Sequence, residues 1–307
     1  MSMPTAERQP LSKSYPLEMV RGSVVDLLKS RNAKQAAGNL RIVDLGAEGL
    51  SLVAGVPLQS SALVGTFALD ITLLFSEYGR MTCARCFCDV GDVTSFSCDT
   101  CFRFSVCERC NTAEVWDSHH LPCQLFCRFP EDLQSQSADC VRFLLDYLCG
   151  VRSGNVHLTQ VMQLLEQRSE WQSPVIRNWC EEYARRVKCA LEAPGIVVNE
   201  SHLAQVLLKG HSNAIRLPIN SDEPPIGWAL SAEVGVMRHS CSPNCEITLS
   251  ANGRFIELHT LRPVLVGEEL TLTYEQAPTL PGTKEGKMMN LLPRPKCVCE
   301  NCKSKTS

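Results

Sequence analysis

The chain has 307 residues, of which 44% are hydrophobic and 21% are charged. Such a composition can form a core, which excludes wholesale disorder, and no apolar run approaches the roughly 18–20 residues of a membrane-spanning helix. The formal charge is −3, and cysteines that bind metal as thiolates would make it more negative. We therefore expect no membrane insertion and no direct nucleic-acid binding. The first ten residues lack the apolar core of a secretion signal, so we expect the nucleus and/or the cytoplasm.

Short strands are expected in the first third of the chain. Residues 1–39 are polar, apart from one short helix expected around Leu17–Lys29. After them, β-branched and apolar stretches alternate with glycines, which is typical of short strands joined by tight turns. We expect these strands at Leu40–Leu45, Leu50–Ala54 and Ala62–Leu74.

Helices are expected in the middle of the chain and strands again near its end. Apolar residues recur at helical spacing between Ala138 and about His211, and Pro174 and Pro194 delimit the longest of these segments. The sequence thus predicts an α+β fold. The later strands are expected at Ile247–Leu249, Phe255–Leu261 and Leu270–Tyr274, with a hairpin turn at Asn252-Gly253 between the first two.

The eighteen cysteines are the strongest chemical signal. In a chain without a secretion signal they are better explained as metal ligands than as disulfides. Between residues 83 and 123, pairs of cysteines two residues apart present their sulfurs convergently, as a tetrahedral zinc site needs. Alternating pairs predict two interlocked sites. The spacing to Cys123 favours His119 over His120 as a ligand, and Cys88 belongs to neither site. The sites are Cys83, Cys86, Cys107 and Cys110, and Cys98, Cys101, His119 and Cys123.

A further set of three cysteines lies near the end of the chain, at Cys297, Cys299 and Cys302. A structural zinc needs a fourth ligand. Spacing alone does not choose among the cysteines outside the two interlocked sites.

Two series of motifs together resemble a known family. Residues 238–245 read Arg-His-Ser-Cys-Ser-Pro-Asn-Cys and residues 267–274 read Gly-Glu-Glu-Leu-Thr-Leu-Thr-Tyr, ahead of the last three cysteines. This order resembles a SET domain with its zinc-binding post-SET tail. The first cysteine block resembles a MYND zinc finger. A MYND finger inserted in a SET domain and followed by a helical insert resembles the SET-and-MYND (SMYD) lysine methyltransferases. These enzymes use S-adenosylmethionine (SAM).

The resemblance implies roles for particular residues. Cys241 is implied as the fourth ligand of the tail zinc, giving three zinc ions in all, and Tyr274 as the catalytic tyrosine. The implied contacts to SAM are Gly46, Glu48, Gly49, Asn213, Arg238 and His239. The implied partners are a protein substrate with a target lysine, histone or non-histone, and a proline-containing peptide at the finger.

This chain also departs from the family pattern. Arg238 stands where the motif begins with asparagine, Gly46 and Glu48 stand where a basic or amide residue is usual, and residues 275–296 contain no aromatic residue. These departures keep an alternative open, a catalytically weak or inactive scaffold that binds partners through its finger.

The resemblance also implies the domain boundaries. They are an N-terminal extension (1–39), the first part of the SET domain (40–82), the MYND-type finger (83–123), a helical insert (124–200), the second part of the SET domain (201–281) and the post-SET tail (282–307).

Overall fold

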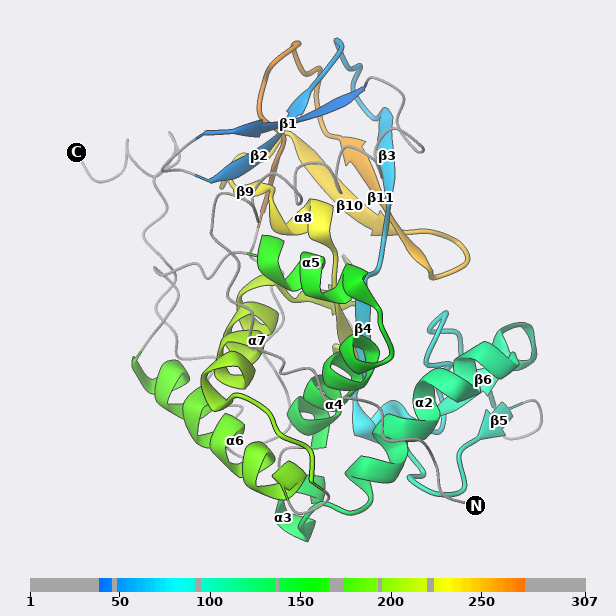
Figure 1. Cartoon of the computed structure of the whole chain (residues 1–307). Coiled ribbons are helices and arrows are strands. Elements are labelled where there is room, and N and C mark those ends of the chain that lie inside the picture. Colours follow the sequence, from blue (N-terminus) through cyan, green and yellow to red (C-terminus); the bar gives the residue numbers. More distant parts are fainter. Residues whose placement is uncertain are drawn as a thin grey trace.

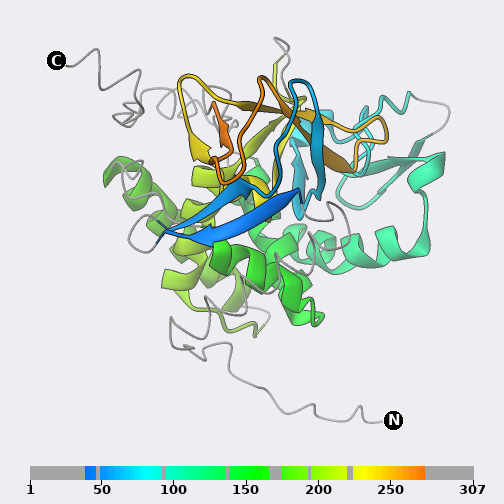
Figure 2. The ribbon, with the colours of Figure 1, turned by 90° about the horizontal axis from the view of Figure 1, so that it is seen from above.

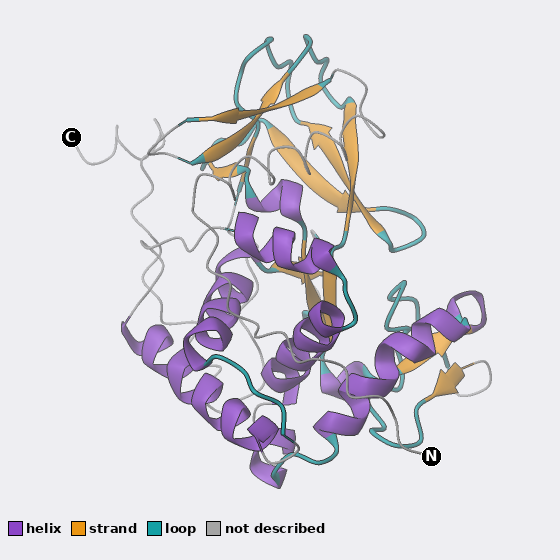
Figure 3. Ribbon diagram, in the orientation of Figure 1, coloured by secondary structure: helices purple, strands orange, loops and turns teal. Residues whose placement is uncertain are grey.

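The computed structural model describes residues 39–45, 49–91, 95–135, 138–165, 174–192, 195–219 and 224–273. The helix expected at Leu17–Lys29 lies outside these residues. Most strands gather at one end of the molecule and most helices at the other, with a few strands among and beside the helices, as Figure 3 shows. The structure therefore has the mixed helix and sheet content that the α+β prediction describes. Among the described helices, none has both the length and the apolar composition that a membrane crossing requires.

The first strands form close to their predicted positions. β1 (Leu40–Asp44) and β2 (Leu50–Ala54) pair antiparallel, and β3 (Leu63–Ala68) is separated from β4 (Ile71–Leu74) by two residues. The expected strand Ala62–Leu74 is thus two strands that belong to different sheets. Leu69 and Asp70 form the break, and the Asp70 carboxylate accepts a hydrogen bond from the backbone N–H of Ala232 at 2.7 Å.

The sheets join the two ends of the sequence. β3 pairs with β11 (Phe255–Thr260), which pairs with β10 (Cys245–Leu249). β4 pairs with β8 (Gly227–Leu230), and β8 with β7 (Ile215–Leu217). β9 (Arg238–His239) and β12 (Thr271–Leu272) run parallel, so the strand expected at Leu270–Tyr274 covers only two of the described residues. Seen from above, early and late strands lie side by side (Figure 2).

Most of the helices lie between β6 and β7 in sequence, and in Figure 1 they lie below the strands β1, β2, β3, β10 and β11. α6 begins at Pro174, where the missing N–H costs no helical hydrogen bond. Val141, Leu144 and Leu145 are fully buried on α4, which confirms the helical spacing. The helices are α3 (Glu131–Ser135), α4 (Ala138–Arg152), α5 (Val156–Leu164), α6 (Pro174–Glu192), α7 (Glu200–Asn213) and the short α8 (Ala232–Gly235).

The cysteine-rich segment (residues 83–123) projects to one side of the molecule (Figure 1). It begins after the turn η2 (Ser76–Tyr78) and contains the hairpin β5 (Ser95–Ser97) and β6 (Ser105–Cys107), the turn η3 (Glu108–Cys110) and α2 (Ala113–Phe126). The helix α2 was not expected from the sequence, and it runs past Cys123 to pack against α4.

Candidate functional site

The structure brings the ligands of the cysteine-rich segment together in the two groups that the spacing predicts. The ligand atoms of Cys83, Cys86, Cys107 and Cys110 (the first metal group) lie within 4.8 Å of one another. Cys86 Sγ and Cys107 Sγ are 3.7 Å apart. A tetrahedral zinc with Zn–S bonds of about 2.3 Å separates its sulfurs by about 3.8 Å. The donor set and its spacing therefore fit a zinc ion.

One thiol of the first metal group, that of Cys107, has a lowered pKa, whereas burial raises the pKa of Cys86 and of Cys110 to about 12. Burial opposes ionisation of Cys107. Hydrogen bonds from the backbone of Cys110 and from neighbouring thiols outweigh it and lower the pKa of the Cys107 thiol to about 6. A thiolate is the form of cysteine that binds metal. Cys88, expected to be spare, lies beside this group, with its Sγ 3.4 Å from that of Cys86.

The turn of the β10–β11 hairpin packs against the first metal group. Arg254 Nη2 donates a hydrogen bond to Cys110 Sγ at 3.4 Å. Gly253 has a φ of 70°, and a Cβ at that position would lie 2.2 Å from the carbonyl oxygen of Cys86. The Asn252-Gly253 turn thus needs glycine both for its backbone conformation and for its contact with the cysteine-rich segment.

The second metal group is Cys98, Cys101, His119 and Cys123, also within 4.8 Å of one another. Cys98 Sγ lies 3.7 Å from Cys123 Sγ, and Cys101 Sγ lies 3.5 Å from His119 Nε2. These values again match the edges of a tetrahedron built on zinc–sulfur and zinc–nitrogen bonds of about 2.3 and 2.0–2.1 Å. His119 and Cys123 lie one turn apart on α2 and therefore face the same way.

His119, not His120, belongs to the second metal group. The imidazole of His119 stacks on Phe104 with ring centroids 3.9 Å apart. Its burial, with Arg142 and His120 nearby, lowers its pKa to about 4, which keeps the ring neutral and able to bind metal. His120 is exposed and its ring contacts Gln124 instead.

A second candidate site lies at the other end of the molecule, where β9 runs beside β12. Arg238 Nε and Nη2 donate to Oε1 and Oε2 of Glu269 at 2.5 and 2.7 Å. Ser51 Oγ on β2 donates to the same Glu269 Oε1 at 2.5 Å. The positive charge of Arg238 is thus matched inside the chain by a carboxylate, which sequence reasoning did not find.

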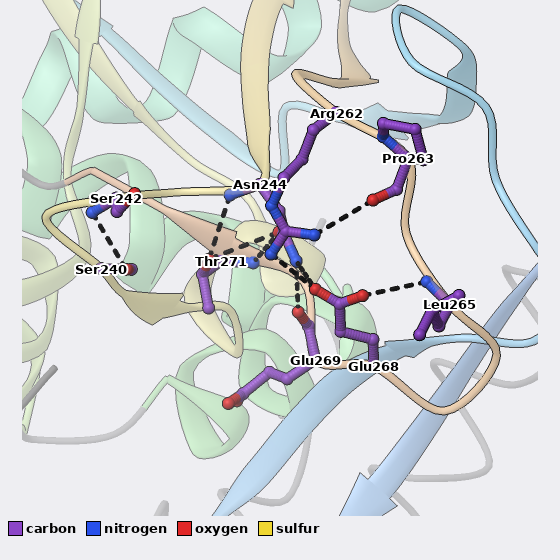
Figure 4. Close-up of polar contacts among 9 residues, drawn as sticks. All are labelled: Ser240, Ser242, Asn244, Arg262, Pro263, Leu265, Glu268, Glu269 and Thr271. Carbon is purple, nitrogen blue, oxygen red and sulfur yellow. Dashed lines mark hydrogen bonds and ion pairs between the residues drawn. The ribbon is translucent and has the colours of Figure 1, made fainter. Parts of the chain in front are cut away.

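Asn244 holds the loop before β10 against the segment before β12 (Figure 4). Its Nδ2 donates to the backbone oxygen of Glu269 at 2.7 Å, and its Oδ1 accepts from the backbone N–H of Thr271 at 2.8 Å. Asn244 is 2% exposed. Next to it, Glu268 accepts from Arg262 at 2.6 Å. Burial opposes ionisation of Glu268, but Arg262, the Leu265 N–H and Asn244 together lower its pKa.

Four of the predicted SAM contacts are among the described residues. Gly49 has a φ of 83° and leads into β2, whose Ser51 reaches Glu269. Arg238 and His239 form β9. Asn213 ends α7, and its Oδ1 lies 3.6 Å from an ideal Cβ position on Gly235, at the end of α8. The structure thus links Gly49 to β9 through Ser51 and Glu269.

The remaining predicted site residues divide by whether the structure describes them. Cys241 is exposed, and its Sγ lies 3.3 Å from Nε2 of His239. The others lie outside the described residues and stay predictions: Gly46, Glu48, Tyr274, Cys297, Cys299 and Cys302.

The SET domain family model matches residues 49–275, which is most of the described chain. The chain belongs to the SET domain family. Its match covers β2 to β12 and spans the cysteine-rich segment, which lies between β4 and α4. The order of motifs in this SET protein is similar to that of SMYD-type lysine methyltransferases.

Individual relatives are more distant. The chain is 24% identical over 238 residues to the human histone-lysine N-methyltransferase SMYD3, a match that covers 74% of this chain and 53% of the relative. The chain therefore spans about half the length of the curated relative that it matches. Among solved structures, the SET domain of LSMT bound to lysine and AdoHcy is similar, with a TM-score of 0.46, 12% identity and coverage of 84% and 54%. The same domain bound to MeLysine and AdoHcy has a TM-score of 0.42 at 12% identity, with coverage of 82% and 53%.

Proposed function

We propose that this SET protein transfers methyl groups from SAM to lysine side chains of a protein substrate, histone or non-histone. The observation that carries the proposal is the match to the SET family over residues 49–275. The link from β2 through Glu269 to β9 supports it, because it brings residues from both ends of the family match to one place.

The pairing of Arg238 with Glu269 favours an active site over a disabled one. An unmatched cation at this position would repel a positively charged sulfonium. A guanidinium held by two charge-assisted hydrogen bonds is oriented and neutralised by its partner. The pairing with Glu269 therefore reduces the charge repulsion that Arg238 would otherwise exert on SAM.

Each residue has a role that follows from its chemistry. Gly49, Asn213, Arg238 and His239 would hold SAM, together with Gly46 and Glu48. When bound, SAM supplies an activated methyl group on a positively charged sulfur. The protein must align the lysine amine with it and exclude water, which can contribute about 7–11 kcal/mol. Tyr274, two residues beyond β12, would orient the amine, and desolvation would keep that amine neutral.

We also infer that both metal groups hold zinc, and that Cys241 joins Cys297, Cys299 and Cys302 around a third ion. The segment 83–123 then acts as a MYND-type finger that binds a proline-containing peptide. The tail from residue 282, the boundaries given above, and a location in the nucleus and/or the cytoplasm belong to the same proposal.

A second candidate function is a scaffold that binds partners through its finger without turnover. Arg238 in place of the family asparagine favours it, and so does the absence of aromatic residues from 275–296. A scaffold need not bind SAM, so SAM binding separates the two functions.

The deciding experiment is methyl transfer from labelled SAM to a peptide array, with Tyr274→Phe beside the wild type and calorimetry of SAM binding to both. Removing only the hydroxyl should lower turnover and leave SAM affinity nearly unchanged. Undiminished transfer by the variant contradicts the role of Tyr274. A wild type with neither SAM binding nor transfer favours the scaffold.

A further inference from the structure

A cleft of about 560 Å³ lies between the cysteine-rich segment and the helices. Its walls come from α2, from β4 and the residues just before it, and from α4 and α5 (Figure 1). It shares none of its lining residues with the site around Arg238. Its volume is that of a site for a drug-sized molecule or a short peptide segment.

Apolar side chains line much of the cleft, beside polar ones from the same elements. β4 and its preceding residues contribute one face, α2 a second, and α5 closes the end. Apolar walls favour a ligand with hydrocarbon surface to bury. The apolar lining residues include Leu69, Ile71, Leu73, Leu121, Phe126 and Leu158.

Three carboxylates line the cleft, those of Asp70, Asp117 and Asp146. Asp70 already accepts a hydrogen bond from the backbone N–H of Ala232 and Asp117 is exposed, which leaves Asp146 on α4 as the carboxylate of interest. Within the described ranges, no residue donates a hydrogen bond to it. Burial raises the pKa of Asp146 to about 6, although Arg142 and Arg85 act in the opposite direction. Asp146 is half-buried, and a ligand that supplies donors to its carboxylate would gain a charge-assisted hydrogen bond.

The two nearby arginines have other partners. Arg142 donates to the backbone oxygens of Leu74 and Arg103 at 2.9 and 3.3 Å. Arg85 donates to Ser118 Oγ on α2 at 3.1 Å. Neither arginine donates a hydrogen bond to Asp146, so the carboxylate oxygens of Asp146 can accept hydrogen bonds from a ligand.

The second metal group adds to the negative potential of the cleft. Cys101, His119 and Cys123 are among the lining residues. Three thiolates and one neutral imidazole around a zinc ion carry a formal charge of −1. The cleft therefore combines apolar side chains, three carboxylates against the two guanidinium groups of Arg85 and Arg142, and a neighbouring anionic centre, so its formal charge stays negative.

We propose that this cleft binds a peptide segment in which a lysine lies between apolar residues, with the lysine ammonium on Asp146. The polar groups of Ser118, Ser153 and Asn155 line the same cleft and can pair with the peptide backbone. A partner held here would lie beside the finger and away from the methyl-transfer site. The proposal is independent of methyl transfer, since it requires neither SAM nor turnover.

The test uses the full chain with its metal and two capped tripeptides, Leu-Lys-Leu and Leu-norleucine-Leu, whose central side chain keeps the four carbons of lysine and lacks the ammonium. We expect the lysine peptide to bind at least about ten-fold more tightly, because hydrogen bonds to charged groups are worth roughly 1.5–3 kcal/mol. Calorimetry measures both affinities, and NMR shift changes report whether α2 and α4 respond. Equal affinities of the two peptides would overturn the proposal.

Variants locate the site. Asp146→Asn should abolish the lysine preference, whereas Asp117→Asn, an exposed acid on the lining of the same cleft, should keep it. Leu121→Lys is a second variant, which places a competing cation at the mouth. Leu121 is 40% exposed, so the fold should tolerate the change. A preference that survives Asp146→Asn or Leu121→Lys would show that the lysine binds elsewhere, including at the methyl-transfer site.

Discussion

Replacing Glu269 with glutamine would remove the negative charge that Arg238 binds while keeping the size of the side chain. The pair is partly exposed, with 39% of the Arg238 side chain and 26% of the Glu269 side chain accessible. Fully exposed pairs contribute roughly 0.2–1 kcal/mol. Two short charge-assisted bonds and the Ser51 hydroxyl raise this value. We therefore expect a coupling energy of about 1–2 kcal/mol between Arg238 and Glu269.

The assay is a double-mutant cycle in urea with Arg238→Asn, Glu269→Gln and both together. Urea is uncharged and does not screen the ion pair. The neighbouring pair Arg262–Glu268 is the matched control, because it has 53% of its arginine side chain exposed and should couple by less than about 1 kcal/mol. Additive effects at Arg238 and Glu269, or a coupling no larger than that of the control, would refute the reasoning.

The same variants report on the SAM site. Glu269→Gln leaves the Arg238 charge unmatched, so SAM affinity should fall, and Arg238→Asn in the same chain should restore it. Calorimetry on the single and double variants measures this. Identical affinities throughout would show that position 238 does not face the cofactor.

Three further predictions concern metal, pH and the hairpin turn. Elemental analysis should find three zinc ions per chain, and chelation should unfold the finger because its own apolar content is small; a content of one or none contradicts the assignment. The pKa of Asp146 is raised from 3.8 to about 6, so its charge destabilises the folded state above that pH. Asp146→Asn should therefore stabilise the protein at pH 7.5 by about 1–3 kcal/mol, with the gain shrinking as pH falls from 6 to about 4 in pH-dependent melting curves. Gly253→Ala should lower the unfolding free energy by about 2–3 kcal/mol, from its positive φ and its approach to Cys86. Gly154→Ala, with a φ of 88° and open space around it, is the control and should lose less.

The metal groups were predictable because their geometry is local. Within each Cys-x2-Cys pair the two sulfurs converge in a single turn. The alternation of pairs along 83–123 then assigns the ligands to two groups. Gly253 was predictable for the same reason, since an Asn-Gly turn between apolar runs has a strong local preference.

The partner of Arg238 was not predictable, because it depends on which strands pair. Arg238 and Glu269 meet only because β9 runs parallel to β12, and no local pattern encodes that pairing. Asp146 shows a second limit. It lies off the apolar stripe of α4, which by itself indicates a solvated position, and it is partly buried because α2 packs against α4. The apolar periodicity of one helix does not show which of its polar positions a neighbouring helix will cover.

The metal groups and the site around Arg238 differ in how far apart their contacting residues lie along the sequence. This difference sets an order in which they can form. The metal groups join residues at most 27 positions apart, from Cys83 to Cys110. Ser51 and Glu269 are 218 positions apart, so closing that loop costs about 2 kcal/mol more in chain entropy. During synthesis the cysteine-rich segment could bind a metal ion while the later strands are still missing, whereas the Arg238 site must wait for nearly the whole matched region. A cell short of metal would thus disturb the earliest step of folding, before any part of the proposed methyl-transfer site exists.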